Sequence, residues 1–357
     1  MKSLIKFILF LIFISSSLLV GFSLGIYMFS TMPNENKDLD EKITSYPVSN
    51  PLDEYSNDGD TPTNLNTQKV KIAQITDQDV VKILENETML TASLSRKNWI
   101  DAKFSPNGKN LALVGMTNDI YDIYVYDLES KDLNQFTFYS QNAKEGVSSY
   151  IWISNDQIYF TQGPQNNMWL HSLDLVSGEI LKISRLNANI LEVNDLKNRI
   201  LLKDSDSSFY LATIGGELMY KIENKSITDV FFTSDDNILF VNYTRDDDMN
   251  VGYLFLGSSE INPIENMKRS EIMCSQSDYA IGFNYENNDL FKVLYENKKV
   301  EPLVKLSDIN KITCSNFVAF AKDSESNWFE IDIQNKQVKE KLEFKNYVDV
   351  IPFVNND

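Results

Sequence analysis

A pattern of about forty residues recurs along most of this chain and restricts the possible folds more than any other feature. Its clearest copy is Asp101–Val114, "DAKFSPNGKNLALV", where a Ser-Pro-Asn-Gly turn separates two apolar runs typical of strands. Weaker copies occupy residues 149–160 and 229–240. Aligned on one position, the copies lie 39 to 49 residues apart and contain Phe104, Ile153, Val193, Phe232, Cys274 and Cys314.

Each copy predicts four short strands. In the clearest copy they are a strand before Phe104 and strands at about 110–116, 122–128 and 133–138. Amphipathic helical periodicity is hard to find after residue 69. Four-stranded sheets repeated at this period are typical of an all-β fold, the β-propeller.

The string "FSPNGKNLALVG…DIYVYDLESKDLNQFT" resembles the blade repeat of TolB-type periplasmic proteins, of WD-repeat-like propellers and of prolyl-oligopeptidase propeller domains. The resemblance covers most of residues 69–353 but depends mainly on the blade that begins near residue 98. It implies a propeller and, by analogy with TolB, a protein partner in a cell-envelope complex. The sequence shows neither the α/β catalytic domain of the oligopeptidases nor the α/β domain of TolB.

The two ends of the repeat region predict the number of blades. Six full units fill residues 98–344, and Tyr347–Phe353 resembles an opening strand such as Ile227–Phe232. Residues 70–91 resemble the last three strands of a blade without the first. We therefore expect a C-terminal strand to complete an N-terminal blade, giving seven blades, with six as the alternative. Pro352 should then lie at the end of that strand.

The N-terminal segment, residues 1–30, predicts a cytoplasmic tip followed by a transmembrane signal-anchor. An apolar run from Phe7 to Phe29 follows Lys2 and Lys6, and is long enough to cross about 30 Å of hydrocarbon. The lysines predict a cytoplasmic N-terminus and an extracytoplasmic propeller. A cleaved signal peptide is the alternative. Residues 31–68 are expected to be a disordered acidic linker, residues 69–353 the propeller and residues 354–357 a tail.

Composition excludes several functions. The formal net charge of −18 makes nucleic-acid binding improbable, because such a surface repels phosphates. The single histidine, His171, lies in "MWLHSLDL", with no nucleophile signature around it, and is interpreted as a structural strand residue. No cofactor or metal site is expected, and no loop has the calcium-binding Asp-x-Asp-x-Asp-Gly spacing.

The only two cysteines, Cys274 and Cys314, occupy equivalent positions in neighbouring repeats. This equivalence favours two small, buried, unbridged side chains. A disulfide requires Cα atoms within about 7 Å, which neighbouring blades reach only near the propeller axis. Bridging is therefore left as the alternative.

Acidic residues recur in the predicted loops between the second and third strands of the blades. Equivalent loops emerge at the same end of a propeller, so these acids should form a ring that attracts a basic partner or holds cations. The alternative, which we prefer, is that Asp and Asn are simply good turn residues. The residues of this candidate acidic face are Asp77, Asp79, Asp119, Asp122, Asp204, Asp206, Asp246, Asp247, Asp248, Glu286, Asp289, Asp323 and Glu325.

These features predict a non-enzymatic, membrane-anchored protein-interaction scaffold on the extracytoplasmic side, with a partner in the cell envelope or a surface complex. Two alternatives remain. One is an enzyme acting on sugars or peptides through a pair of carboxylates at the propeller axis, which needs no histidine. The other is a sensor of a small ligand or cation, stabilised when it binds.

Overall fold

The computed structural model describes residues 70–354, apart from 77–80, 86–87, 91–93, 95–97, 140–145, 165–166, 236, 277, 316 and 341–346. They belong to one compact unit, residues 64–357. The predicted membrane segment and linker, the four-residue tail except Val354, and the acids Asp77 and Asp79 lie outside the described residues. Within the described part of the chain, no helix is long and apolar enough to cross a membrane.

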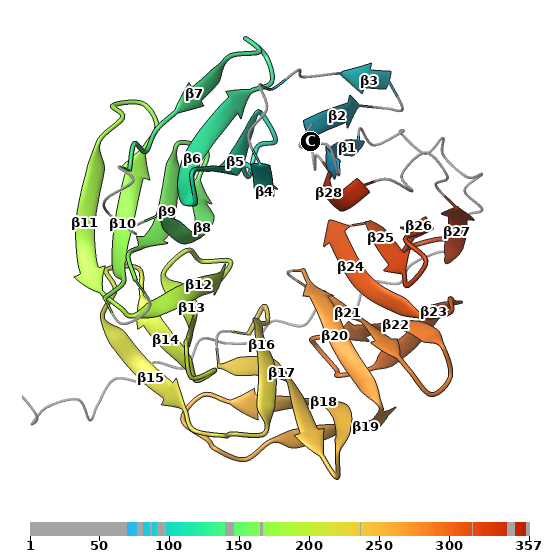
Figure 1. The fold of residues 1–357 in the computed structure, drawn as a ribbon. Coiled ribbons are helices and arrows are strands. Elements are labelled where there is room, and N and C mark those ends of the chain that lie inside the picture. The colour runs from blue at the N-terminus through green and yellow to red at the C-terminus, as the bar shows by residue number, and fades with distance from the viewer. Residues whose placement is uncertain are drawn as a thin grey trace, which may run out of the picture. The chain divides into compact units, whose positions relative to one another are not determined.

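The described residues form seven four-stranded antiparallel sheets, arranged as the blades of a propeller (Figure 1). The first blade in the chain consists of β1 (Val70–Thr76), β2 (Val81–Glu85) and β3 (Thr88–Leu90), together with β28 (Tyr347–Val354). The next two are β4 (Asn98–Phe104), β5 (Asn110–Thr117), β6 (Ile120–Asp127) and β7 (Leu133–Gln135), then β8 (Val147–Ser154), β9 (Gln157–Gln162), β10 (Trp169–Asp174) and β11 (Ile180–Arg185).

The remaining four blades repeat the same strand order. They are β12 (Ala188–Val193), β13 (Arg199–Asp204), β14 (Phe209–Thr213) and β15 (Leu218–Ile222); β16 (Ile227–Phe232), β17 (Ile238–Arg245), β18 (Asp248–Phe255) and β19 (Asn262–Lys268); β20 (Ser270–Ser275), β21 (Tyr279–Asn284), β22 (Asp289–Leu294) and β23 (Val300–Lys305); and β24 (Ile309–Ser315), β25 (Val318–Asp323), β26 (Trp328–Asp332) and β27 (Gln337–Glu340). The all-β propeller of seven four-stranded blades is confirmed.

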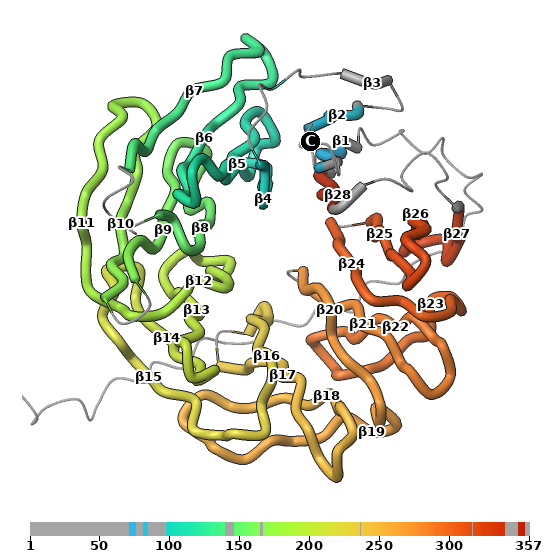
Figure 2. Tube along the Cα trace, viewed as in Figure 1, coloured from blue at the N-terminus to red at the C-terminus, as the bar shows by residue number. Residues whose placement is uncertain are grey.

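Closure occurs as the sequence predicted. β28 pairs antiparallel with β1, with Lys71 opposite Phe353 and Gln74 opposite Val350, so the two ends of the described chain share one blade (Figure 2). This pairing hydrogen-bonds the inner edge of β1, which would otherwise be left open.

The expectation for Pro352 is wrong. It lies opposite Ile72 inside β28, with two strand residues after it, rather than at the strand's end. β28 is tolerant of proline because it is an edge strand of its own sheet, in the order β28-β1-β2-β3. Only one of its edges takes part in the ladder, so a missing N–H on the other edge costs no strand pairing.

The core lies between the blades, on both faces of each sheet. Second strands are therefore continuous apolar runs, such as Leu111–Leu113 in β5 and Ile200–Leu202 in β13, whose residues are 0% exposed. Outermost strands such as β11 are mostly exposed; Leu181 in β11 is 55% exposed. The gradient from apolar inner strands to polar outer strands orients each blade around the axis.

The innermost strands β4, β8, β12, β16, β20, β24 and β28 surround that axis (Figure 1). Equivalent positions of neighbouring inner strands contact each other, as where Trp152 Nε1 of β8 donates to Lys103 O of β4 at 2.9 Å. At another junction, buried Asn242 donates to Ile272 O at 2.8 Å and accepts from Ile272 N at 2.7 Å. The inner strands therefore run in the same direction, so their first residues lie at one end of the propeller axis and their last residues at the other.

Cys274 and Cys314 form a disulfide between β20 and β24, with Cα atoms 6.2 Å apart. The preference for two unbridged cysteines is therefore wrong. Their equivalence was read correctly, but equivalent positions of two adjacent inner strands are close enough to be bridged.

A β-bulge recurs in the inner strands and presents a charged residue immediately after it in five of them. The register shifts before Asp101 in β4, Glu192 in β12, Asp229 in β16, Lys311 in β24 and Asp349 at the pairing of β28 with β1. Bulges re-aim the side chains that follow them. This repeated irregularity places charged groups near the axis.

Candidate functional site

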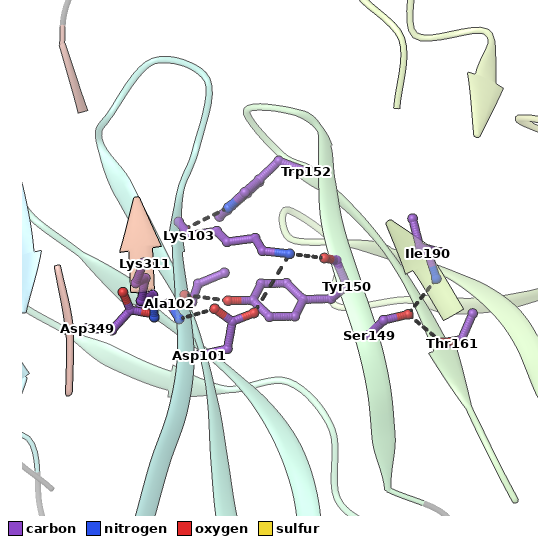
Figure 3. A network of polar contacts seen from close by, with 11 residues as sticks. Asp101, Ala102, Lys103, Ser149, Tyr150, Trp152, Thr161, Ile190, Lys311 and Asp349 are labelled. Atoms are coloured by element: carbon purple, nitrogen blue, oxygen red, sulfur yellow. Dashed lines mark hydrogen bonds and ion pairs between the residues drawn. The ribbon is translucent and has the colours of Figure 1, made fainter. Parts of the chain in front are cut away.

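Three neighbouring inner strands contribute a cluster of alternating charges, here called the axial cluster: Asp101 and Lys103 of β4, Lys311 of β24 and Asp349 of β28 (Figure 3). Lys311 Nζ lies 2.8 Å from Asp349 Oδ2, and Lys103 Nζ lies 3.7 Å from Asp101 Oδ2. Because strand order places β28 between β24 and β4, the cluster spans the blade that closes the ring.

Backbone and aromatic contacts hold the β4 half of the cluster in place (Figure 3). Ala102 N donates to Asp101 Oδ1 at 2.8 Å. Lys103 Nζ donates to Tyr150 O at 2.8 Å and lies 4.7 Å from the centroid of the Tyr150 ring. The Lys103 ammonium therefore interacts with Tyr150 of β8 as well as with Asp101. As a result, the Asp101 carboxylate is only loosely paired with it.

A cavity of about 540 Å³ opens beside Asp101 and is called the junction pocket. It lies between the β4–β7 blade and the β8–β11 blade, at the end where second and third strands are connected. Its volume falls within the roughly 300–1,000 Å³ typical of ligand sites. Its lining residues are Ile100, Asp101, Val114, Asp119, Tyr121, Gly146, Val147, Ser148, Ser149, Tyr150 and Gly163.

The electrostatics of the junction pocket favour a positively charged guest. Among the described residues that line it, Asp101 and Asp119 carry charge, and both are acids. The pKa of Asp101 is raised, chiefly because surrounding protein displaces water, with Lys103 acting in the opposite direction. The pKa of Asp101 is raised although 40% of its side chain is exposed, because the exposed part faces the concave wall of the pocket rather than open solvent. A bound cation would supply the stabilisation that the carboxylate has lost.

The structure places the described acids of the predicted face in or next to the second-to-third-strand connections, except Asp122, which lies inside β6 and is buried, so the expectation is wrong for that residue. Only Asp119 among them lines the junction pocket. Asp119, Asp246 and Asp247 adopt positive φ angles of 63°, 54° and 65° in tight turns, a conformation that Asp tolerates better than most residues. These three positions are therefore accounted for by turn formation.

Other acids of the face hold turns or pair with basic side chains. Asp122 is 5% exposed and accepts from Thr137 Oγ1 at 2.8 Å. Asp204 accepts from Ser208 N and Asp323 from Asn327 N, at 2.9 and 2.8 Å. Two of the remaining acids pair with basic side chains, Asp248 with Lys268 and Arg269, and Asp289 with Lys305. The other three, Asp206, Glu286 and Glu325, lie in the turns. A role for this face in partner binding stays a prediction.

Sequence reasoning missed Asp101, Tyr121 and Asp349, although a signal was present. Opening strands such as "WIDAKF", "ITDVFF" and "YVDVIP" each contain an aspartate within an apolar run. In a strand buried between neighbouring blades, a charge at that position should have been interpreted as facing the axis. The bulge that aims it could not be read from the residues themselves.

His171 lies in β10, is 8% exposed, and stacks on Phe160 with ring centroids 5.1 Å apart. Burial lowers its pKa, and it does not line the junction pocket. Among the described residues, no three His, Cys, Asp or Glu side chains gather in a way that could hold a metal ion.

The fold and its inner-strand geometry define the class of protein as a seven-bladed β-propeller. No protein-family model matches the chain, and no curated protein matches it in sequence. The solved structures similar to it include an oligogalacturonate lyase from Vibrio parahaemolyticus, with a TM-score of 0.53 and 12% identity over 77% of this chain and 84% of that one.

Two further solved structures are similar. The computationally designed Ika8 protein has a TM-score of 0.51 and 12% identity over 77% of this chain and 87% of its own. TolB from Acinetobacter baumannii has a TM-score of 0.45 and 11% identity over 81% of this chain and 67% of its own. At these identities the comparisons show the fold alone.

Proposed function

We propose that this protein is a binding scaffold, and that its junction pocket receives a basic side chain of a protein partner. The observation that carries the proposal is the pocket's lining, in which two carboxylates stand beside apolar and aromatic walls. Lys and Arg side chains combine an alkyl stem with a charged end, and they require both kinds of surface. Ile100, Val114 and Val147 would contact the stem, while Asp101 and Asp119 would receive the charge.

Exposure of the pocket walls supports docking from outside. Ile100 is 48% exposed and Tyr121 is 36% exposed, although both are large apolar or aromatic residues. An aromatic ring and a carboxylate around one cation add cation–π attraction to the charge pairing. The rigid inner strands β4 and β8 supply most of the wall, so little order would be lost on binding.

We further propose that the propeller is tethered to a membrane on its extracytoplasmic side, as part of a cell-envelope or surface complex. The apolar run Phe7–Phe29 after Lys2 and Lys6 supports the anchor and its orientation. The Cys274–Cys314 disulfide supports an oxidising compartment, since such bonds rarely persist in the cytosol. Protease protection of the propeller in cells stripped down to the cytoplasmic membrane, lost when that membrane is permeabilised, would contradict this orientation.

The test is affinity capture from detergent-solubilised membranes with the tagged full-length chain and a control lacking residues 69–357. Partners retained only with the propeller are then tested against Asp101→Asn and Asp119→Asn. Capture should fall at least tenfold at low salt in the double variant, because both carboxylate charges in the pocket are lost. Asp206→Asn, an exposed turn acid outside the pocket, is the matched control. Equal loss in both would assign binding to the whole acidic face instead.

A second candidate function is carboxylate chemistry on a sugar or peptide. The observation that favours it is the difference between Asp101, whose pKa is raised by burial, and its neighbour Asp349, which is paired with Lys311 at 2.8 Å. Two nearby carboxylates in unlike environments can divide acid and base roles. We favour binding because each of the two carboxylates lies beside a lysine. Release of reducing ends from oligosaccharides that is abolished by Asp349→Asn would reverse that preference.

A further inference from the structure

The turn between β4 and β5 contains the only Asn-Gly pair in the chain, Asn107-Gly108. Asparagine is chemically labile, and most so before glycine, which has no Cβ to shield its backbone nitrogen. Once deprotonated, Gly108 N can attack Asn107 Cγ, so that an N–C bond forms, the bond from Cγ to Nδ2 breaks and ammonia leaves. Water then opens the resulting succinimide ring to aspartate or to isoaspartate. The reaction therefore needs no reactant other than water.

The folded turn keeps both reacting groups in unreactive positions. Gly108 N donates to Ser105 O at 2.8 Å, and a nitrogen that serves as a donor retains its proton. Asn107 Oδ1 accepts from Ser105 Oγ at 2.8 Å and from Lys109 N at 3.0 Å, which fixes the carboxamide. Asn107 N donates to Asn155 Oδ1 of the next blade at 2.9 Å. Deamidation therefore requires the turn to open locally.

The blade β28-β1-β2-β3, here called the closing blade, holds the turn from the other side. Lys71 Nζ of β1 donates to Gly108 O at 2.9 Å. The Phe353 ring of β28 lies 5.5 Å from the Phe104 ring between centroids and covers Gly108 so closely that a Cβ built there would overlap it. The turn is thus fixed by side chains from near both ends of the described chain.

We propose that Asn107 is a deamidation site that reacts when the closing blade opens, and that its isoaspartate product prevents the blade from closing again. This modification is independent of the partner docking proposed for the junction pocket. β28 pairs along one edge only and is far in sequence from the rest of its sheet, so it can separate without unfolding another blade. When it separates, Phe353 no longer covers the turn and Asn107 reacts irreversibly.

The two products should affect the turn differently. Isoaspartate carries the main chain through the side-chain carbonyl, which adds one carbon between residues 107 and 108. Gly108 would then have to move, although the Phe353 ring fills the space beside it. Aspartate keeps the original main chain and still has oxygens that accept from Ser105 Oγ and Lys109 N. Chains with isoaspartate should therefore stay open, whereas chains with aspartate should close.

The experiment incubates the detergent-solubilised full chain at neutral and mildly alkaline pH. Peptide mapping by mass spectrometry measures deamidation at Asn107 and separates the two products. Phe353→Ala removes the ring that covers Gly108 and should raise the rate about tenfold, because the rate follows the population of the open turn. The rate should also rise with pH, because Gly108 N must lose its proton. A peptide of residues 101–114 gives the rate of the unprotected sequence.

The matched control is Cys274→Ser with Cys314→Ser, which weakens the β20–β24 junction and leaves the contacts of the turn intact. This double variant should deamidate at Asn107 within about twofold of the wild-type rate, because its closing blade is unchanged. Acceleration equal to that of Phe353→Ala would mean that unfolding of the whole propeller exposes Asn107. That result would overturn the proposal, as would a wild-type rate equal to that of the peptide.

If Phe353→Ala does not fold, Lys71→Met serves instead. It removes only the hydrogen bond to Gly108 O and should raise the rate about threefold, whereas an unchanged rate would contradict a role of the closing blade. The effect of the product is tested on the deamidated chains after chromatographic separation. The isoaspartate form should unfold at a lower urea concentration than the aspartate form. Equal unfolding of the two forms would overturn the claim that isoaspartate prevents closure.

Discussion

The two ends of the propeller axis surround a buried carboxylate with different groups. Asp101 and Glu192 both lie on inner strands, and burial raises both pKa values. Asp101 has Lys103 at 3.7 Å and borders a large, partly apolar pocket, whereas Glu192 is held by Phe232 N and Ser275 Oγ beside a small polar one. At Asp101 the charge of Lys103 opposes the effect of burial, whereas at Glu192 the opposing groups are chiefly the neutral donors Phe232 and Ser275, with a smaller contribution from Lys197.

The largest effect should come from removing the covalent link, which is present only at the Glu192 end. Cys274→Ser with Cys314→Ser opens the β20–β24 junction next to Ser275, and we expect a loss of about 2–4 kcal/mol in unfolding free energy. Urea unfolding of the oxidised protein and of the variant at pH 7 measures this loss. The variant should still bind the Asp101-dependent partner; loss of that binding would mean that the two ends are coupled.

The next largest effect concerns pH. The pKa of Glu192 in the folded protein, about 7, lies above its ordinary value of 4.5, so the folded state binds more protons between these limits. Stability from this group is therefore full below pH 4.5 and is lost as pH rises through 7. Glu192→Gln should exceed wild type by about 1–3 kcal/mol at pH 8.

Unfolding free energies of wild type and Glu192→Gln, measured from pH 5 to pH 8, check this prediction. Asp101→Asn is the control for a change of buried charge at the other end. If wild type and Glu192→Gln kept parallel pH profiles, Glu192 would not be the titrating group.

A smaller effect on stability is expected at Asp119, on the rim of the junction pocket. Asp119 has a φ of 63°, which Asn also adopts readily, whereas a β-branched residue does so with strain. Asp119→Asn should leave thermal stability unchanged, while Asp119→Val should cost about 1–2 kcal/mol. Thermal melting of both variants separates the turn role of Asp119 from its charge. An equally stable Val variant would show that the turn is not constrained as described.

The smallest effect should be on the pairing of Asp101 itself. Lys103→Met removes the charge that lowers the pKa of Asp101, so that pKa should rise further, as followed by carboxyl-carbon NMR titration. Both side chains are more than a third exposed, so the change in stability should stay below about 1 kcal/mol. Lys311→Met is the control, because Lys311 affects Asp101 more weakly. A larger shift in the control would mean that Asp349 pairing dominates.

The architecture could be predicted because it follows from repetition. The Ser-Pro-Asn-Gly turn after Phe104 and its copies gave the strand order, and the resemblance of Tyr347–Phe353 to an opening strand gave the seventh blade. Both are local patterns of residue type and period. The structure confirms each of them.

The site could be predicted only in part, because pockets depend on how blades are packed. Asp119 was identified from its loop, but Asp101 and Glu192 lie in strands, where bulges and neighbouring blades determine their surroundings. The same limit applies to Cys274 and Cys314, whose equivalence was visible although the 6.2 Å between their Cα atoms was not. Distances between repeats are properties of the ring, and no single repeat contains them.

The pairing of β28 with β1 has a consequence for biosynthesis. While the chain is still being made, β1 has no partner on its inner edge, and it stays so until the residues around Val350 have left the ribosome. The blades from β4 to β27 can form earlier, because each is continuous in sequence. A stalled or truncated product would hold six finished blades beside an open strand, the kind of edge that recruits other chains into aggregates. Release of the β28 residues therefore determines whether the molecule closes on itself or joins its neighbours.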